Sequence, residues 1–424
     1  MAEATTESVR TEVRAWIDEQ WDPDRTVAEW WQRLSDGRWA VPTWPETAFG
    51  RGYGGDLARV VSEELREVGA VGAPAGLGIL LAGPTIYTHG DAAQQERYLG
   101  PIVNGQEAWC QLFSEPGAGS DLASLQTKAE RDGDEWVITG QKVWTSGGQA
   151  ADLGMLIART DPEAPKHQGI TYFAFEMDQP GVEVRPLREM TGRALFSEVF
   201  IDGARVSNDA MIGGLNNGWA VANTTLAFER AGLGGGGSGA GGGAFPGRKG
   251  SMLDTRVGDL VGGVGRGRSV QPSAFGGSYG MFQSLAEKLG RTDDAVIRQH
   301  LVELYTLNEI GRMTMLRMKA ERAAGRGNVH AGNLAKLLMS KITRLSRDLG
   351  PEILGPEAML TGPETTGGGF VQEMTLFAPA PSIYGGTDEV QRNIIGERAL
   401  GLPKEPGPDK LTPFRELRVG TQPV

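Results

Sequence analysis

Several residue types and segments are scarce in this chain. Its 424 residues include a single cysteine, Cys110, and four histidines that lie far apart in sequence. A disulfide within the chain is therefore excluded, and so few thiolate and imidazole ligands predict that there is no metal site. No run of about 18 apolar residues occurs, so we expect no membrane span.

Basic residues are the minority among the charges. The chain has 42 Lys and Arg against 53 Asp and Glu, a formal net charge of −11. An overall field of this sign does not favour nucleic acid, so we expect no nucleic-acid partner. The first residues lack the basic-then-apolar order of a secretory signal, and we expect a cytoplasmic protein.

The secondary structure that the sequence predicts changes twice along the chain. Residues 1–105 read as helices broken by Pro- and Gly-rich loops, residues 106–213 as short strands separated by turns, and residues 214–424 as helices again. At roughly 100–200 residues per domain, this length suits about three domains. We predict an α+β protein with an N-terminal helical domain, a middle antiparallel β-barrel-like domain and a C-terminal helical bundle.

Local patterns predict particular elements inside these domains. Residues 136–139 and 142–144 flank Gly140 and Gln141, which predicts a β-hairpin. Asp294 and its two predecessors offer an N-cap to a long helix, and residues 333–349 predict a second helix with a leucine-rich face. Glycine, at 63 residues, is about twice as frequent as usual and is densest over residues 232–267.

Three short segments carry residues suited to a polar ligand. Residues 111–121 read Q-L-F-S-E-P-G-A-G-S-D, a turn with exposed N–H groups and the hydroxyl of Ser120, in which Asp121 is able to cap a following helix. Residues 140–148 read G-Q-K-V-W-T-S-G-G, where an indole precedes two hydroxyls, as suits a flat polar ring such as flavin. Residues 383–393 read I-Y-G-G-T-D-E-V-Q-R-N, in which two glycines precede a helix N-terminus. Taken singly, each segment also fits an ordinary turn, strand end or capped loop.

Together, the three segments resemble the acyl-CoA dehydrogenase family. The motifs E-P-G-A-G-S-D, G-Q-K-x-W-x-[ST] and Y-x-G-T-x-[QE]-x-x-R stand in the family's order and approximate spacing. The resemblance implies FAD bound between the β-domain and the C-terminal helices. It also implies α,β-dehydrogenation of an acyl-CoA thioester, with hydride passing from Cβ to flavin N5 and electrons then passing to an electron-transfer flavoprotein.

The resemblance also places cofactor and substrate contacts on named residues. The flavin-contacting positions of the family fall on Leu112, Phe113, Ser114, Gly119, Ser120, Trp144, Thr145, Ser146, Thr387 and Glu389. Positions that meet the substrate fall on Ser120, Arg230 and Tyr384. Many relatives have glutamine where this chain has Glu389.

The catalytic base departs from the commonest family pattern. Most relatives carry a glutamate within Y-E-G-T, but this chain has Gly385 there, which retains only a backbone N–H to polarise the thioester carbonyl. The isovaleryl- and long-chain-type enzymes instead carry a glutamate directly before an arginine on a C-terminal helix. Glu229, directly before Arg230, matches that position, so we predict that Glu229 is the base.

A second departure concerns assembly. The family's R-x-x-F-G motif, which contacts a neighbouring subunit's flavin, has no match here; either Arg248 or Arg256 replaces it, or this chain supplies no such arginine. The second arrangement resembles bacterial enzymes that act as heteromers on steroid side-chain CoA esters, so a heterotetramer and a bulky acyl group are favoured over a homo-oligomer. The motifs leave two other functions open, an acyl-CoA oxidase and a non-catalytic partner subunit.

Overall fold

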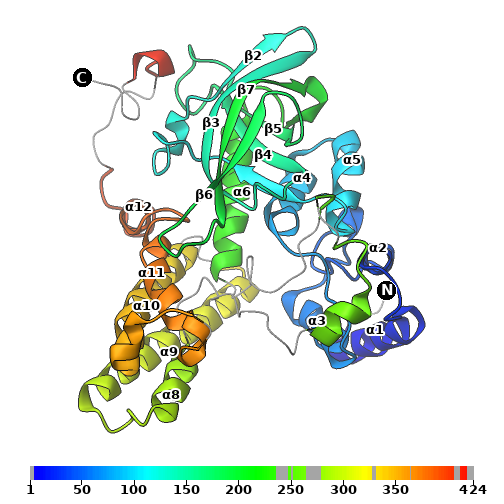
Figure 1. Cartoon of the computed structure of the whole chain (residues 1–424). Helices are drawn as coiled ribbons and strands as arrows, with labels where there is room; N and C mark the ends of the chain where they lie inside the picture. The colour runs from blue at the N-terminus through cyan, green and yellow to red at the C-terminus, as the bar shows by residue number, and fades with distance from the viewer. Residues whose placement is uncertain are drawn as a thin grey trace.

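A computed structural model describes residues 4–234, 247–249, 252–263, 278–326, 331–362, 364–404 and 411–417. N-terminal helices, a β-sheet and C-terminal helices follow one another along the chain, as predicted. They occupy separate regions except for residues 252–263, which lie beside the N-terminal helices (Figure 1). No helix in these ranges is long and apolar enough to cross a membrane.

The N-terminal region is a cluster of helices around buried indoles. Its helices are α1 (Thr6–Gln20), α2 (Val27–Asp36), α3 (Gly55–Glu67), the π-helix η2 (Gly78–Ala82), α4 (Gly83–His89) and α5 (Ala92–Val103). Thr5, Thr26 and Asp91 form capping boxes that fix the starts of α1, α2 and α5. Trp30 and Trp31 are fully buried, and their indole N–H groups donate to backbone carbonyls.

The middle region is an eight-stranded sheet with the order β6-β7-β3-β2-β4-β5-β8, and β1 pairs with β4. Its strands are β1 (Trp109–Leu112), β2 (Lys128–Asp132), β3 (Glu135–Ser146), β4 (Leu153–Arg159), β5 (Ile170–Glu176), β6 (Val182–Leu187), β7 (Phe196–Ser207) and β8 (Met211–Ile212). Most pairs are antiparallel, but β1 runs parallel to β4, so the sheet is mixed rather than purely antiparallel. The ladder between described strands ends at β6 and β8 without closing into a barrel.

The prediction of a hairpin at Gly140 and Gln141 is wrong, because both residues lie inside the continuous strand β3. The observed hairpin joins β2 to β3 through Gly133, whose φ of 65° suits a turn. Gly140 serves a different need: a Cβ there would lie 2.4 Å from Oγ1 of Thr127 and 2.7 Å from its Cα. The glycine therefore permits a close approach between two segments rather than a change of direction.

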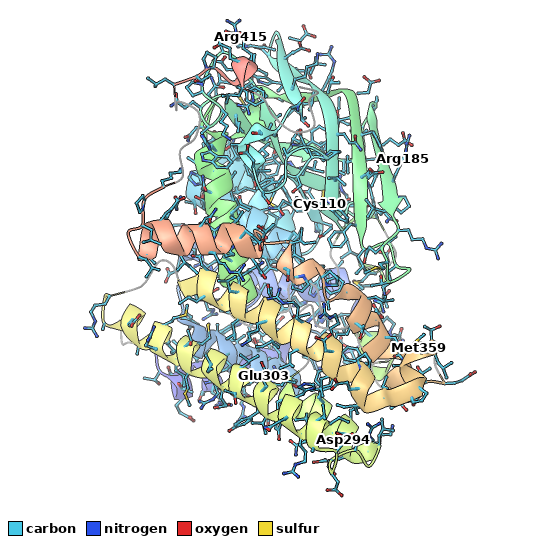
Figure 2. All side chains as sticks on the ribbon, turned by 90° about the vertical axis from the view of Figure 1, so that its left-hand side faces the viewer. Cys110, Arg185, Asp294, Glu303, Met359 and Arg415 are labelled. Carbon is cyan, nitrogen blue, oxygen red and sulfur yellow. The ribbon has the colours of Figure 1, made fainter. Side chains whose placement is uncertain are left out.

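The C-terminal region contains α6 (Gly218–Gly234), α7 (Val257–Gly263), α8 (Tyr279–Lys288), α9 (Ala295–Ala323), α10 (Ala331–Leu354), α11 (Phe370–Phe377) and α12 (Asp388–Ile394). The predicted cap of the long helix is confirmed, since Asp294 Oδ1 accepts from the N–H groups of Val296 and Ile297. Helices α9 and α10 lie along one another, with α12 across one end (Figure 2).

The long helices bury polar groups where the sequence suggests a leucine face. On α10 the buried residues include Asn333, Lys336 and Ser340, whereas Leu334 is 42% exposed. Half of the glycine-dense stretch lies outside the described residues, as does the nearest F-G pair at positions 275–276. The described residues of α7 and the turn before it pack on the N-terminal helices, where Val257 N–H donates to Arg25 O (2.9 Å).

Candidate active site

Helix α6 lies at the junction of the three regions. It contacts β5 of the sheet, η2 and α4 of the N-terminal helices, and α10 of the C-terminal helices (Figure 1). Glu229 stands in its last two turns and is partly buried. Burial, the largest influence, raises the pKa of the Glu229 carboxyl above its ordinary value, and a hydrogen bond from Gln111 and the charge of Arg230 oppose the rise.

Two further predicted site residues lie near this carboxylate. Burial raises the pKa of Tyr384, and the charge of Glu229 raises it further, which indicates that the phenol and the carboxylate share one environment. Arg230 is half-buried, and burial lowers its pKa. The structure therefore brings Tyr384 close to Glu229 and its neighbour Arg230, although more than a hundred positions separate them in the chain.

The loop after Tyr384 is held by an amide network. Gly385 and Gly386 both adopt left-handed backbone conformations, with φ of 64° and 82°, which a glycine adopts without strain. Gln391 Nε2 donates to Gly385 O (2.7 Å), and the Gln391 carbonyl accepts from Asn333 Nδ2 on α10. The N–H of Gly385 forms no hydrogen bond with another described residue, so it remains available to a ligand.

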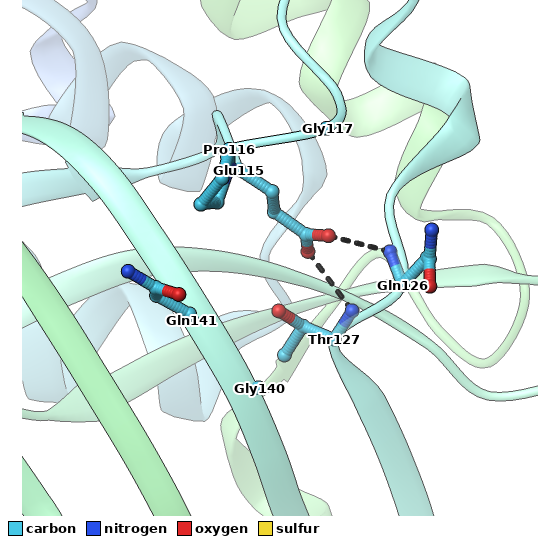
Figure 3. Close-up of a pocket in the computed structure, with 7 residues that line it drawn as sticks. All are labelled: Glu115, Pro116, Gly117, Gln126, Thr127, Gly140 and Gln141. Atoms are coloured by element: carbon cyan, nitrogen blue, oxygen red, sulfur yellow. Dashed lines mark hydrogen bonds between the residues drawn. The ribbon is translucent and has the colours of Figure 1, made fainter. Parts of the chain in front are cut away.

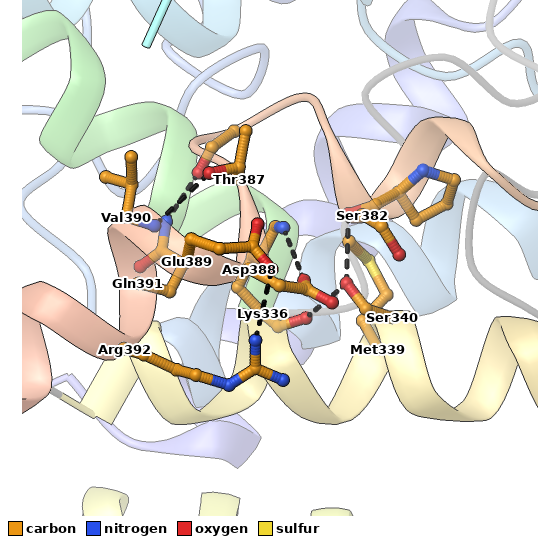
Figure 4. A network of polar contacts seen from close by, with 12 residues as sticks. Lys336, Met339, Ser340, Ser382, Thr387, Asp388, Glu389, Val390, Gln391 and Arg392 are labelled. Carbon is orange, nitrogen blue, oxygen red and sulfur yellow. Dashed lines mark hydrogen bonds and ion pairs between the residues drawn. The ribbon is translucent and has the colours of Figure 1, made fainter. Parts of the chain in front are cut away.

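The start of α12 rests on an ionic cluster against α10 (Figure 4). Asp388 accepts from Lys336 Nζ (3.0 Å) and from Arg344 (2.8 Å), both of α10. Burial favours the neutral acid, but bonds from Arg344, Ser340 and Lys336 prevail and lower the pKa of Asp388 to about 2. The hydroxyl of Thr387 accepts from Val390 N–H as an N-cap, whereas the side chain of Glu389 is 76% exposed and pairs with Arg392.

In the first predicted flavin segment, a buried carboxylate stabilises the turn. Glu115 accepts from the N–H groups of Gln126 (2.6 Å) and Thr127 (2.9 Å), and these residues line a pocket of about 420 Å³ (Figure 3). Lys142 Nζ, fully buried, donates to Glu115 (2.8 Å) and to Phe113 O (3.1 Å). Burial lowers the pKa of Lys142; burial also acts to raise the pKa of Glu115, but the charge of Lys142 and the hydrogen bonds to the carboxylate prevail and lower it.

Around that turn, the residues predicted to contact the flavin differ in their exposure to solvent. Leu112 and Phe113 are buried, Ser114 is half-buried, and Gly119 and Ser120 are exposed. Asp121 does not cap backbone N–H groups; it accepts from the Ser124 hydroxyl and from Lys166 Nζ (2.7 Å).

In the second predicted flavin segment, a β-bulge exposes the indole of Trp144. The register between β3 and β7 shifts between Lys142 and Thr145, and Trp144 inside this bulge has a φ of 62°. Its side chain is 57% exposed and meets the ring of Phe196 edge-on. Ser146 is exposed beside it, whereas the Thr145 side chain is buried on the other face, so only the backbone of Thr145 faces that surface.

These residues suit a flavin. Trp144 supplies an apolar ring face and Ser146 a hydroxyl, and a Cβ at Gly119 or Gly147 would meet nothing within 4 Å, which leaves room for a ligand to approach the backbone. The described residues contain no group of His, Cys, Asp or Glu suited to a metal ion.

Sequence reasoning missed the partners that hold the site. Gln111, Lys142, Gln391 and Asn333 stand inside or beside the segments singled out, yet nothing in their local pattern identifies what they bind. The amide of Gln111 meets Glu229 across 118 positions, and that of Asn333 meets Gln391 across 58.

Comparison with known proteins decides the family. Three family models match in the order expected: the acyl-CoA dehydrogenase N-terminal domain over residues 1–106, the middle domain over 110–203 and the C-terminal domain over 269–400. The chain belongs to the acyl-CoA dehydrogenase family. Family membership confirms the predicted α+β fold, and it makes this protein an oxidoreductase of the class that dehydrogenates acyl-CoA thioesters; members of the family are flavoproteins.

Individual relatives cover nearly the whole dehydrogenase. Acyl-CoA dehydrogenase IpdE1 of Mycobacterium tuberculosis is 36% identical over 379 residues, 89% of this chain and 88% of the relative. A solved structure described as the Tcur3481-Tcur3483 steroid ACAD is 26% identical, with a TM-score of 0.69, and the match covers 96% of this chain and 99% of that one. The ChsE4-ChsE5 complex of Mycobacterium tuberculosis, 24% identical with a TM-score of 0.66 over 96% of this chain and all of the matched chain, shares the fold.

Proposed function

We propose that this chain is a catalytic subunit of an FAD-dependent acyl-CoA dehydrogenase, that Glu229 is its base, and that its substrate is a bulky acyl-CoA of the steroid side-chain class. One observation carries the assignment of the base. The carboxylate of Glu229 is desolvated at the junction of three regions, and Gln111 is its single hydrogen-bond donor among the described residues. An ionised group with so little compensation is costly to folding, which is typical of a functional site.

The residues around this carboxylate have different roles in the proposed reaction. Glu229 takes the proton from Cα of the thioester, and the N–H of Gly385 donates to the thioester oxygen and stabilises the charge that develops there. FAD, when bound, accepts the hydride from Cβ at N5. The thioester thus loses one proton and one hydride, two electrons in all, and gains a Cα=Cβ double bond.

The flavin contacts follow from the exposed groups of the three segments. Trp144 would offer its exposed ring to the flavin, and Ser114 and Ser146 would supply hydroxyls. The side chains of Leu112 and Phe113 are buried, so those residues would contribute backbone groups. Thr387 and Gly119 border the same site. Ser120, Arg230 and Tyr384 face the acyl-CoA. Glu389, exposed and paired with Arg392, is the weakest of these assignments.

The substrate class rests on similarity to the Tcur3481-Tcur3483 steroid ACAD, which matches this chain over nearly its full length. The name of that structure joins two different proteins, Tcur3481 and Tcur3483. This similarity supports a heteromer for the present chain as well. The exposed apolar side chains of α9 supply a surface for such assembly: Val302, Tyr305, Ile310, Met313 and Leu316. We propose an electron-transfer flavoprotein as the acceptor of the electrons.

The decisive experiment replaces the base in the flavin-loaded protein, co-expressed with the products of neighbouring genes. Glu229→Gln keeps size and hydrogen bonding but removes the proton acceptor. We expect anaerobic flavin bleaching by CoA esters to slow on the order of thousands-fold, toward the upper end of the ~10²–10⁴ that a general base contributes. Flavin content stays unchanged, and the half-buried Glu373→Gln on α11 serves as the matched control.

The other outcomes separate the competing functions. Bleaching at a near-normal rate in Glu229→Gln assigns the base to another residue. Stoichiometric peroxide formation in air identifies an oxidase. Absence of flavin from the lone chain and from every co-expressed assembly rejects the flavoenzyme assignment. A panel of short branched, long straight and sterol side-chain CoA esters tests the substrate class, which requires the last to bleach fastest.

A further inference from the structure

The side-chain amide of Gln111 lies beside the carboxylate of Glu229. Its Nε2 atom is 3.4 Å from Glu229 Oε2. Nε2 carries only N–H groups, so the amide donates and the carboxylate accepts. The separation is long for a hydrogen bond, but contacts of catalytic groups often shorten when a ligand closes the site. Among the described residues it is the only hydrogen bond of either side chain.

The backbone of Gln111 is fixed by the sheet. Gln111 is the third residue of β1, which pairs in parallel with β4 and places it opposite Met155. Its neighbours Cys110 and Leu112 are fully buried on one face. Since side chains alternate along a strand, the amide of Gln111 points to the other face, where α6 carries Glu229. A rigid strand therefore presents the amide to the carboxylate.

We propose that Gln111 is a positioning residue for the base: its amide holds Oε2 of Glu229 and leaves Oε1, which has no protein donor among the described residues, to receive the substrate proton. This inference rests on the proposed role of Glu229. The residue acts through the carboxylate, because a fixed carboxylate loses less orientational freedom when the thioester arrives.

The same contact sets how easily the base is ionised. Burial raises the pKa of Glu229, while the Gln111 bond and the charge of Arg230 lower it. The other titratable or charged groups on segments packed against α6 include three phenols, Tyr384 before α12, Tyr87 on α4 and Tyr172 on β5. Two histidines whose pKa is lowered by burial also contact α6: His89 of α4 bonds to Thr224 (2.8 Å), and the ring of His167 meets Trp219. Lys336 on α10 is bound to Asp388, and the charge of Arg398 acts on Arg230. Without the amide, burial is opposed by Arg230 alone, so the pKa of Glu229 rises.

The test is Gln111→Leu in the flavin-loaded assembly, with the rate of flavin bleaching followed across pH using the CoA ester that reacts fastest. A hydrogen bond to a charged group is able to shift a pKa by roughly one to two units. For a contact this long, we expect the acidic limb of the pH–rate profile to move up by about one pH unit. The rate recovers in part at high pH, where the base is ionised again, and the remaining deficit reflects the lost orientation of the carboxylate. Gln283→Leu is the matched control, since that half-buried glutamine donates to Glu287 (2.9 Å) on α8, away from the site.

A second measurement needs no substrate. The infrared difference between each Gln111 background and its Glu229→Gln counterpart isolates the carboxyl band of Glu229, and its titration midpoint must rise in Gln111→Leu and in Gln111→Met. A midpoint that stays in place, or a rate loss that is equal at every pH, overturns the positioning role. Fast bleaching in Glu229→Gln instead overturns the base assignment itself, so the two failures are distinguishable.

Discussion

At the scale of single residues, Glu229 is a carboxylate whose position costs folding stability. Burial raises its pKa above the unfolded value, so the folded protein binds this proton more tightly than the unfolded chain does. The contribution to stability is therefore full below the unfolded pKa of about 4.3 and is lost as pH rises through the folded pKa. We predict that Glu229→Gln has a higher Tm than the parent at neutral pH, and that the difference shrinks near pH 4.

Thermal unfolding at several pH values measures this effect. Glu303→Gln is the control, because that side chain lies on the surface of α9 and its contact with Lys341 is long (Figure 2). A parent that is more stable than Glu229→Gln at neutral pH contradicts the prediction. A gain in stability joined to a loss of activity is typical of active-site carboxylates.

The contribution of Asp388 to stability depends on pH in the opposite direction. Its buried carboxyl is held by Arg344, Ser340 and Lys336, and its pKa is lowered to about 2 from 3.8. Its contribution to stability is present above the unfolded pKa and is lost as pH falls toward 2. We predict that Asp388→Asn lowers the free energy of unfolding by about 2 kcal/mol at pH 7, and that the loss diminishes between about pH 4 and pH 2.

Urea unfolding at pH 7 and pH 3 checks this prediction, with the exposed Asp293→Asn as the control. An equal deficit at both pH values would mean that the substitution disturbs packing rather than charge. The variant also tests the site, because Asp388 supports the loop that carries the N–H of Gly385.

At the scale of elements, the pair of Lys142 and Glu115 joins strand β3 to the turn of the first flavin segment. Removing one partner of a buried pair leaves an uncompensated charge, so we predict that Lys142→Met costs about 3–5 kcal/mol in urea unfolding. Adding Glu115→Gln recovers part of that loss, because the amide oxygen still accepts from a backbone N–H without carrying a charge.

The surface residue Lys128 on β2 provides the comparison. It pairs with Glu130 at 2.8 Å but is half-exposed, so Lys128→Met changes stability by at most about 1 kcal/mol. Similar losses at Lys142 and Lys128 would contradict the structural role given to the buried pair.

At the scale of the whole molecule, the prediction concerns how many flavins an assembly holds. FAD carries a diphosphate that needs cationic or N–H partners, and this chain lacks the R-x-x-F-G motif. The two arginines considered as its replacement are engaged within the chain: Arg248 contacts Asp152 (3.4 Å), and Arg256 binds Asp24. We predict a heterotetramer with fewer flavins than subunits.

Native mass and flavin absorbance of the co-expressed complex give the stoichiometry. A homotetramer purified alone with one flavin per chain contradicts the need for a partner, while the dehydrogenase activity stands. The lone chain, expressed without neighbours, is expected to retain little flavin.

The features that could be predicted from the sequence depend on residues close together in the chain. The helix–sheet–helix order follows from periodicity, the start of α9 from Asp294, and the three ligand segments from motifs of about ten residues each. The replacement of the common base by Gly385, and the glutamate that stands before Arg230, are likewise visible in the sequence alone. Such features are local because caps, turns and motif loops are formed by neighbouring residues.

What only the tertiary structure decided depends on contacts between distant segments. Gly140 predicts a turn by its type, but the nearby backbone of Thr127 makes it a packing glycine inside β3. Helix α10 buries Asn333 and Lys336 because α12 supplies their partners, Gln391 and Asp388. Gln111 gains a role only because β1 and α6 bring it to Glu229. Burial and pairing are set by the packing of segments far apart in the chain, and one-dimensional patterns do not specify which segments meet.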